Sequence, residues 1–281
     1  MMRIDAHHHF WQPGRGDYDW MPKDNATLNR AYGPVDLAPQ LKSAAIDGTV
    51  LVQAAASIEE TEYMLGLADA TPWVLGVVGW INFEDPGQIA QLTRLARHPK
   101  FKGVRPMIQD IADVNWMLCE DVGWAYRAII DLDLSFDALG FAQHLDNFLA
   151  LKQRYPAMRM VIDHIMKPQI ADTMAGGDAF GPWAAGIGRL ADETDAYCKL
   201  SGLVTEAASG WSIDDLRPFA RHVLDSFGAE RVMWGSDWPV CRLKAEYEVW
   251  HATAHQLSLH LTASDVEQVF GGAATRFYRL E

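Results

Sequence analysis

Eight short apolar runs alternate with helical patterns along the 281 residues of this chain. The runs fall at residues 3–11, 49–53, 73–81, 101–107, 132–137, 158–164, 196–201 and 231–237. Strands that alternate with helices predict a parallel sheet, because each crossover helix returns the chain to the edge where the strand began. Eight such units at this length predict an α/β protein with one domain, a (β/α)8 TIM barrel over residues 1–281. No glycine-rich turn follows the first run, which disfavours a dinucleotide-binding fold.

Polar side chains end most of these runs. In a barrel, active-site residues lie at the carboxyl ends of the strands, so these side chains are expected to meet at one mouth. They are His7, His9, Gln53, Asn82, Arg105, Asp137, Asp163, His164, Ser201 and Asp237. A polar residue can also end a strand simply because the chain emerges into solvent there. Three histidines, together with an aspartate followed by a tryptophan, favour an enzyme over that alternative.

The opening run, residues 3–11, contains three consecutive histidines. Side chains alternate between the two faces of a strand, so Asp5, His7 and His9 are expected on one face and His8 on the other. Two imidazoles about 7 Å apart along a strand can hold a metal ion or polarise a carbonyl group. A cloning remnant is the alternative, but these histidines stand between apolar residues, as in a buried strand.

Two further residues have the chemistry of a catalytic site. Asp237 closes an apolar run beside Trp238, where partial loss of hydration would suit a general base or a metal ligand. An aspartate that caps the next turn is the alternative. His164 ends another run and can supply a third imidazole, although a histidine at a strand end can also be purely structural.

The charge balance narrows the choice of partners. The formal net charge is −13 at pH 7, whereas nucleic acids and anionic membranes attract basic surfaces. We therefore expect a small-molecule substrate and neither of those partners. No apolar run reaches the roughly 18 residues of a membrane span, and no secretion signal is visible. The three scattered cysteines are expected as free thiols, so the chain is expected to be cytoplasmic.

Three motifs together give the chain a family resemblance. They are Asp-x-His-x-His at residues 5–9, Asp-His at 163–164 and Gly-Ser-Asp-Trp-Pro at 235–239. With these motifs the chain resembles the amidohydrolase superfamily over nearly its whole length, and within it the sugar-lactonase branch of L-fuconolactonase- and L-rhamnonolactonase-type enzymes. The resemblance implies hydrolysis of a sugar lactone to the sugar acid. It implies catalytic roles for His7, His9, His164 and Asp237.

The resemblance also bears on metal binding. Many amidohydrolases have a carbamylated lysine on the fourth strand and a histidine on the fifth. This chain has Lys102 early and Arg105 late in the fourth run, and Asp137 at the end of the fifth, so a binuclear centre is not expected. The remaining ligand set is His7, His9, His164 and Asp237. This set can hold one Zn²⁺ or Mn²⁺ ion, or the histidines can polarise the carbonyl without metal, as in some relatives; the sequence leaves both open.

The resemblance implies a mechanism in which Asp237 accepts a proton from the water that attacks the lactone carbonyl. The histidines or a metal ion stabilise the oxyanion that forms. Arg105 is a candidate substrate anchor, with a structural ion pair as the alternative. The other candidates for substrate binding, each with a structural role as the alternative, are Gln53, Trp11, Trp80, Trp116, Trp238 and His144.

Two other functions compete with lactone hydrolysis. One is a metal-dependent decarboxylase or hydrolase of a pyrone or aromatic carboxylate, since related barrels share the opening motif. Those relatives usually have a fifth-strand histidine, and Asp137 in its place counts against this function. The other is a non-catalytic barrel that binds a sugar acid, and the complete set of three histidines and Asp237 counts against it. Neither the stereochemistry of the lactone nor the oligomeric state is readable from these motifs.

Overall fold

The computed structural model describes residues 1–280, which contain eight parallel strands in one sheet. The strands are β1 (Ile4–His8), β2 (Gly48–Val52), β3 (Val74–Gly79), β4 (Phe101–Val104), β5 (Ser135–Ala138), β6 (Arg159–Ile162), β7 (Tyr197–Leu200) and β8 (Val232–Trp234). Their order in the sheet follows the chain from β1 to β8. A parallel bridge between His8 and Trp238 joins the last strand segment to the first. The predicted barrel is therefore confirmed.

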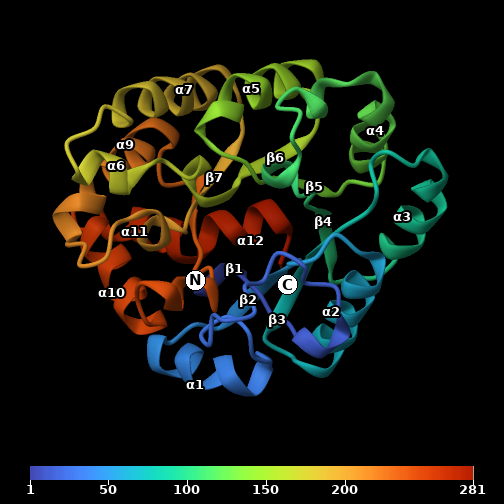
Figure 1. Ribbon diagram of the computed structural model, residues 1–281, viewed down its shortest axis with the longest axis horizontal. Helices are drawn as coiled ribbons and strands as arrows, with labels where there is room; N and C mark the ends of the chain where they lie inside the picture. Colours follow the sequence, from blue (N-terminus) through green and yellow to red (C-terminus); the bar gives the residue numbers. More distant parts are fainter. Residues whose placement is uncertain (281) are drawn as a thin grey trace.

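Helices form an outer layer around this ring of strands (Figure 1). The α-helices of residues 1–280 are α1 (Pro34–Ala44), α2 (Ile58–Ala70), α3 (Ile89–Leu95), α4 (Gly123–Asp131), α5 (Leu145–Arg154), α6 (Ile170–Met174), α7 (Phe180–Glu193), α8 (Leu203–Glu206), α9 (Ile213–Phe227), α10 (Tyr247–Leu257), α11 (Ala263–Glu267) and α12 (Ala273–Tyr278). Each crossover brings the chain back to the same side of the sheet. All eight strands therefore present their carboxyl ends at one mouth of the barrel.

The other end of the barrel is closed by apolar packing. One cluster of buried side chains joins the strands to α12, and its members include Ile4, Val50, Val78, Val161, Met233, Phe277 and Tyr278. In Figure 1, α12 lies across the middle of the ring rather than in the outer layer. Because this end is filled with hydrocarbon, the buried polar side chains that the strands provide gather toward the opposite mouth.

The alternation expected for the opening strand is wrong at Asp5. Its carboxylate accepts a hydrogen bond from the hydroxyl of Tyr247 in α10, at 3.2 Å. The pairing of β1 with β2 shifts its register between Asp5 and His8, and such an irregularity re-aims the side chains next to it. His7 and His9 lie together, with their Nε2 atoms 3.2 Å apart. The His8 ring is not part of this pair and contacts β2 instead.

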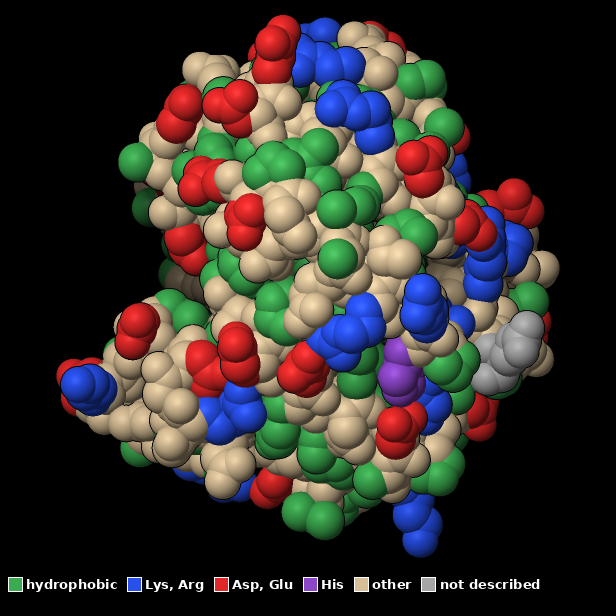
Figure 2. Space-filling model, turned by 90° about the vertical axis from the view of Figure 1, so that its right-hand side faces the viewer, with side chains coloured by type: hydrophobic (Ala, Val, Ile, Leu, Met, Phe, Trp, Pro, Cys, Tyr) green, Lys and Arg blue, Asp and Glu red, His purple; other side chains and the backbone are tan. Residues whose placement is uncertain are grey.

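Other expectations concern the surface and the cysteines. Within residues 1–280, no helix has the length and apolar character needed to cross a membrane. Acidic and basic side chains are interspersed over the face shown in Figure 2. Cys119 is exposed, Cys198 and Cys241 are buried, and all three are free. The prediction of free thiols is therefore confirmed.

Candidate active site

A cavity of about 310 Å³ opens at the carboxyl ends of the strands. Its polar lining consists of His9, Arg105, Gln109, His164, Lys167 and Asp237. Its apolar lining includes Trp11, Trp20, Leu28, Leu139 and Leu243. A small, mostly apolar cavity into which a few polar groups converge is the usual form of a binding site for a small molecule.

Three histidines and one aspartate converge at the base of this cavity, and all four are buried. Asp237 Oδ1 lies 3.3 Å from His9 Nε2, 3.9 Å from His7 Nε2 and 3.9 Å from His164 Nε2. The structure therefore brings together residues from β1 and from the segments directly after β1, β6 and β8, which lie far apart in the sequence. They are the four residues to which the sequence resemblance gives catalytic roles.

The rings of His9 and His164 are oriented toward Asp237 by hydrogen bonds of their Nδ1 atoms, which lie on the side away from the aspartate. His9 Nδ1 lies 2.7 Å from the carbonyl oxygen of Val52. Because a carbonyl can only accept, His9 donates from Nδ1, and in its neutral form Nε2 then has a free lone pair. His164 Nδ1 lies 2.9 Å from Ser201 Oγ, which likewise leaves Nε2 directed at the aspartate. Partners of this kind orient the histidine ligands of metal sites.

At neutral pH the cluster combines the neutral rings of His7 and His164 with a charged carboxylate. Burial lowers the pKa of His7 well below its usual value and that of His164 to about 4. Burial raises the pKa of Asp237, but its interactions with His164 and His9 act in the other direction, and the pKa ends below its usual value. Neutral imidazole and ionised carboxylate are the states in which these groups bind a cation or accept a proton.

The spacing of these atoms fits one divalent cation. A tetrahedral site with metal–nitrogen bonds of about 2.0–2.1 Å has neighbouring ligand atoms roughly 3.3 Å apart. The separations among His7, His9 and Asp237 are 3.2, 3.3 and 3.9 Å, so small adjustments bring them to that geometry. These three residues form one candidate metal group, to which His164 Nε2 adds a fourth donor at 3.9 Å from Asp237.

A second candidate group, of His7, Asp163 and His164, already contains a cation. The Lys199 ammonium lies 2.9 Å from Asp163 Oδ1 and 3.1 Å from His7 Nδ1. It also donates to Asp137 Oδ2 at 2.6 Å. Burial raises the pKa of Asp163, but Lys199 and other neighbours outweigh it and hold that pKa well below its usual value. Lys199 thus neutralises the position that a second metal ion would need.

Arg105 lines the cavity, but protein groups engage much of its guanidinium. Nη1 donates to Asp163 Oδ2 at 3.1 Å, and Nη2 donates to the carbonyl oxygen of Gln53. The Gln53 amide is fully buried and donates to the carbonyl oxygen of Arg105 at 2.7 Å. The structural ion pair that was the alternative role for Arg105 is therefore present. Gln53 does not line the cavity, and its hydrogen bonds hold Arg105 in position.

The candidate aromatic residues divide between the cavity and the core. Trp11 lines the cavity, and its ring stacks beside His9. Trp238 is buried against other aromatic rings, and His144 accepts a hydrogen bond from the Phe141 amide at 3.0 Å. Trp80 lines a separate hollow together with Trp116. Of the candidates for substrate binding, Trp11 and Arg105 thus lie on the cavity wall.

Several functional candidates were missed by sequence reasoning. Trp20, Gln109 and Lys167 line the cavity, and each lies in a segment that follows a strand. Position after a strand is the signal that would have singled them out. Lys199 lies within β7, two residues before Ser201. Since Ser201 was a candidate at the strand end, strand alternation would have placed Lys199 on the same face.

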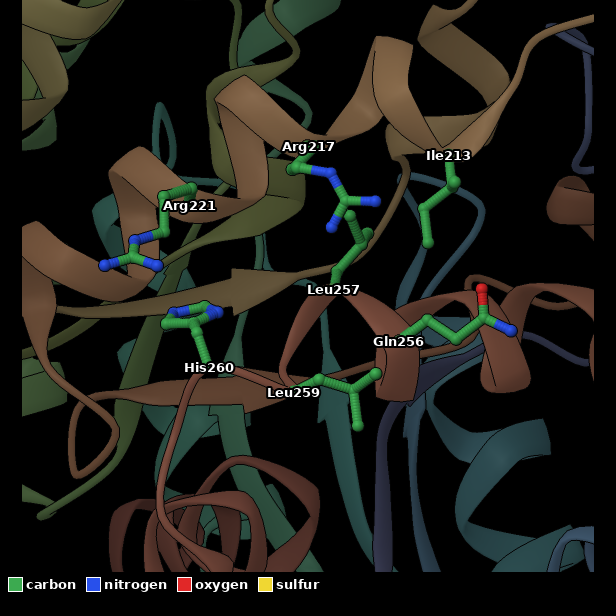
Figure 3. Close-up of a pocket in the computed structure, with 7 residues that line it drawn as sticks. All are labelled: Ile213, Arg217, Arg221, Gln256, Leu257, Leu259 and His260. Carbon is green, nitrogen blue, oxygen red and sulfur yellow. The ribbon is translucent and has the colours of Figure 1, made fainter.

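A larger hollow, about 560 Å³, lies between α9 and the end of α10. Figure 3 shows its lining, with Arg217 and Arg221 from one helix facing Leu257 and His260 from the other segment. The two guanidinium groups are paired with acids on their own helix. No strand end contributes to its lining, so the residues predicted to be catalytic lie at the smaller cavity and not here.

Comparisons with known proteins identify the family of this chain. Residues 4–280 match the family model described as amidohydrolase. The chain is 41% identical to an L-fucono-1,5-lactonase of Burkholderia ambifaria over 283 residues, which covers 99% of this chain and 96% of that protein. It is 36% identical to an L-fucono-1,5-lactonase of Burkholderia multivorans, with 99% and 96% covered.

A solved structure is similar over the full length of both chains. It is an amidohydrolase from Burkholderia multivorans crystallised with bound zinc, 35% identical in sequence, with a TM-score of 0.92 and 100% of each chain covered. A similarity of this extent includes the barrel and the segments that follow its strands.

Proposed function

The chain belongs to the amidohydrolase family, and on that premise we propose that it hydrolyses a sugar lactone of the L-fucono-1,5-lactone type. The observation that carries this proposal is the convergence of His7, His9, His164 and Asp237 at the base of a cavity of about 310 Å³. Two relatives that are 41% and 36% identical over 99% of this chain are L-fucono-1,5-lactonases. The chain is accordingly a hydrolase that acts on a cyclic ester.

In the proposed mechanism Asp237 provides the base. Its carboxylate is ionised at neutral pH, so it can hold a water molecule and accept a proton as the water oxygen attacks the lactone carbonyl. The rings of His7, His9 and His164 surround the position proposed for the carbonyl oxygen. A divalent cation held by these residues would polarise that carbonyl as a Lewis acid. Donors of three imidazoles and one carboxylate are typical of Zn²⁺, and we propose zinc as the ion.

The cavity walls suit a sugar ring with polar and apolar faces. Trp11 and Trp20 provide aromatic surface, on which the C–H face of a sugar can pack. Gln109 and Arg105 provide polar groups for ring hydroxyls. The competing decarboxylase function has less support, because Asp137, in place of the expected histidine, is committed to the Lys199 ion pair.

The test is lactone opening by the purified full-length protein. L-Fucono-1,5-lactone is added, and acid release is followed with a pH indicator against the spontaneous rate. Asp237→Asn should lower kcat about 10²- to 10⁴-fold with an unchanged circular dichroism spectrum, whereas Lys42→Met, on the exposed side of α1, should leave kcat unchanged. An absence of acid release from this lactone and from L-rhamnonolactone would contradict the proposal.

The metal assignment has its own test. Thorough chelation should reduce the rate, and added Zn²⁺ should restore it more fully than added Mg²⁺, because nitrogen donors favour zinc. Full activity after chelation, with metal analysis showing none bound, would instead assign the polarising role to the histidines themselves.

A further inference from the structure

Lys167 reaches the cavity from an unusual backbone segment. His164, Ile165, Met166 and Lys167 have φ values of 52°, 46°, 61° and 45°, so four successive residues with side chains adopt the left-handed conformation. Such conformations are unfavourable because Cβ approaches the following carbonyl oxygen. They persist where the surrounding structure enforces them, and they cluster at functional sites. This left-handed turn gives both His164 and Lys167 a place on the cavity wall.

The Lys167 ammonium is held on the side of the cavity formed by the segments after β4 and β5. It donates to Gln109 Oε1 at 2.5 Å and lies 5.5 Å from the centre of the Phe141 ring. Among residues 1–280, Gln109 is its one hydrogen-bond acceptor, and an ammonium has three protons to donate. Burial lowers the pKa of Lys167, although the carboxylates of Asp237 and Glu206 act in the opposite direction. Lys167 thus has protons available to a bound ligand.

Besides a base for the attacking water, lactone hydrolysis requires a proton for the departing ring oxygen. When the bond between the carbonyl carbon and the ring oxygen breaks, the departing oxygen is an alkoxide and a poor leaving group unless it is protonated. Asp237 is directed at the histidine cluster by its contacts with His9 and His164. The Lys167 ammonium is instead anchored by Gln109, from the segment after β4, so the two groups are held by different parts of the cavity wall.

Resting on the proposed function, we propose that Lys167 is a further catalytic residue, the general acid that protonates the leaving ring oxygen. The water oxygen bonds to the carbonyl carbon while Asp237 takes its proton. The bond to the ring oxygen then breaks, its electron pair stays with that oxygen, and Lys167 supplies the proton. The proton on Asp237 returns to Lys167 through solvent. Each turnover therefore consumes one lactone and one water and releases the open hydroxy acid.

The first experiment changes the leaving atom. L-Fucono-1,5-lactone is compared with its analogue that has sulfur in place of the ring oxygen, because a thiol has a pKa near 8.5 and leaves without protonation. Lys167→Met should lower kcat about 100-fold or more on the oxygen lactone and less than about 10-fold on the thiolactone. Lys167→Arg should behave similarly, since a guanidinium has the charge but retains its proton. Lys42→Met is the matched control.

Equal losses on the two substrates would overturn the proposal, because a lysine that only binds ring hydroxyls or supports the fold affects both lactones alike. Full activity of Lys167→Arg would also overturn it. Failure of the proposed function is a separate result, in which the unaltered enzyme opens neither lactone.

A second experiment uses chemical rescue and needs no sulfur analogue. In Lys167→Ala, added ethylammonium should restore part of kcat on the oxygen lactone, because it supplies both charge and a proton. Tetramethylammonium, which has charge and no proton, should restore none. Equal rescue by the two ions, or none by either, would overturn the assignment of Lys167 as an acid.

Discussion

Lys199→Met tests how the polar base of the site is held together. The ammonium is fully buried and lies 2.6 Å from Asp137 Oδ2 and 2.9 Å from Asp163 Oδ1. Removing one partner of a buried ion pair costs about 3–5 kcal/mol, because the other charge stays buried without compensation. Here Arg105 still pairs with Asp163 and the Tyr278 hydroxyl still donates to Asp137. We therefore expect the lower end of the range, about 3 kcal/mol.

The assay is thermal and urea unfolding of the purified variant beside the unaltered protein and Lys42→Met. In a domain of this size each kcal/mol shifts Tm by about 2–4 °C, so Lys199→Met should lower Tm by about 6–12 °C. Adding Asp137→Asn should recover about 1 kcal/mol or more, since it removes a carboxylate that has lost its counter-charge. A Lys199→Met variant within about 0.5 kcal/mol of the unaltered protein, or a double variant with strictly additive losses, would refute this reasoning.

Two further predictions concern catalysis. We expect kcat/KM to be level from pH 5 to 8 and to fall as pH drops through about 4. The reason is that burial lowers the pKa of His164 to about 4, and protonation occupies the lone pair that faces Asp237. Circular dichroism at each pH separates this loss from unfolding, and a fall in kcat/KM centred above pH 6 would contradict the prediction. Trp20→Ala should raise KM about 2- to 10-fold, since one aromatic contact contributes roughly 0.5–1.5 kcal/mol. Trp80 lies outside the cavity, so Trp80→Ala should leave KM unchanged. Equal effects of the two substitutions on KM would contradict the proposed position of the substrate.

The barrel and the convergence of the cluster were predictable for one reason. In a parallel barrel the carboxyl ends of all strands meet at one mouth, so His7, His164 and Asp237 are brought together by topology alone, whatever their separation in the sequence. Their catalytic roles stay predictions. The face of Asp5 was not predictable in this way, because a register shift in β1 interrupts an alternation that the sequence pattern assumes.

The two lysines were harder to predict, for different physical reasons. Lys199 lies in a short apolar strand, and whether a charge there is buried depends on partners in β5 and β6 that sequence spacing does not reveal. Lys167 depends on four left-handed residues without a glycine among them. Local propensity disfavours that conformation, so tertiary structure must impose it.

The arrangement of charges explains why the site fits a single ion. Beneath the cluster, the carboxylates of Asp137 and Asp163 are opposed by the cations of Lys199 and Arg105, so this region is close to neutral before any metal binds. Asp237, by contrast, faces the rings of His7 and His164, which are neutral at pH 7. A divalent cation gains its electrostatic stabilisation beside Asp237, whereas a second one would have to displace an ammonium that already bridges two carboxylates. Lys199 thus supplies the positive charge that a second metal ion would bring.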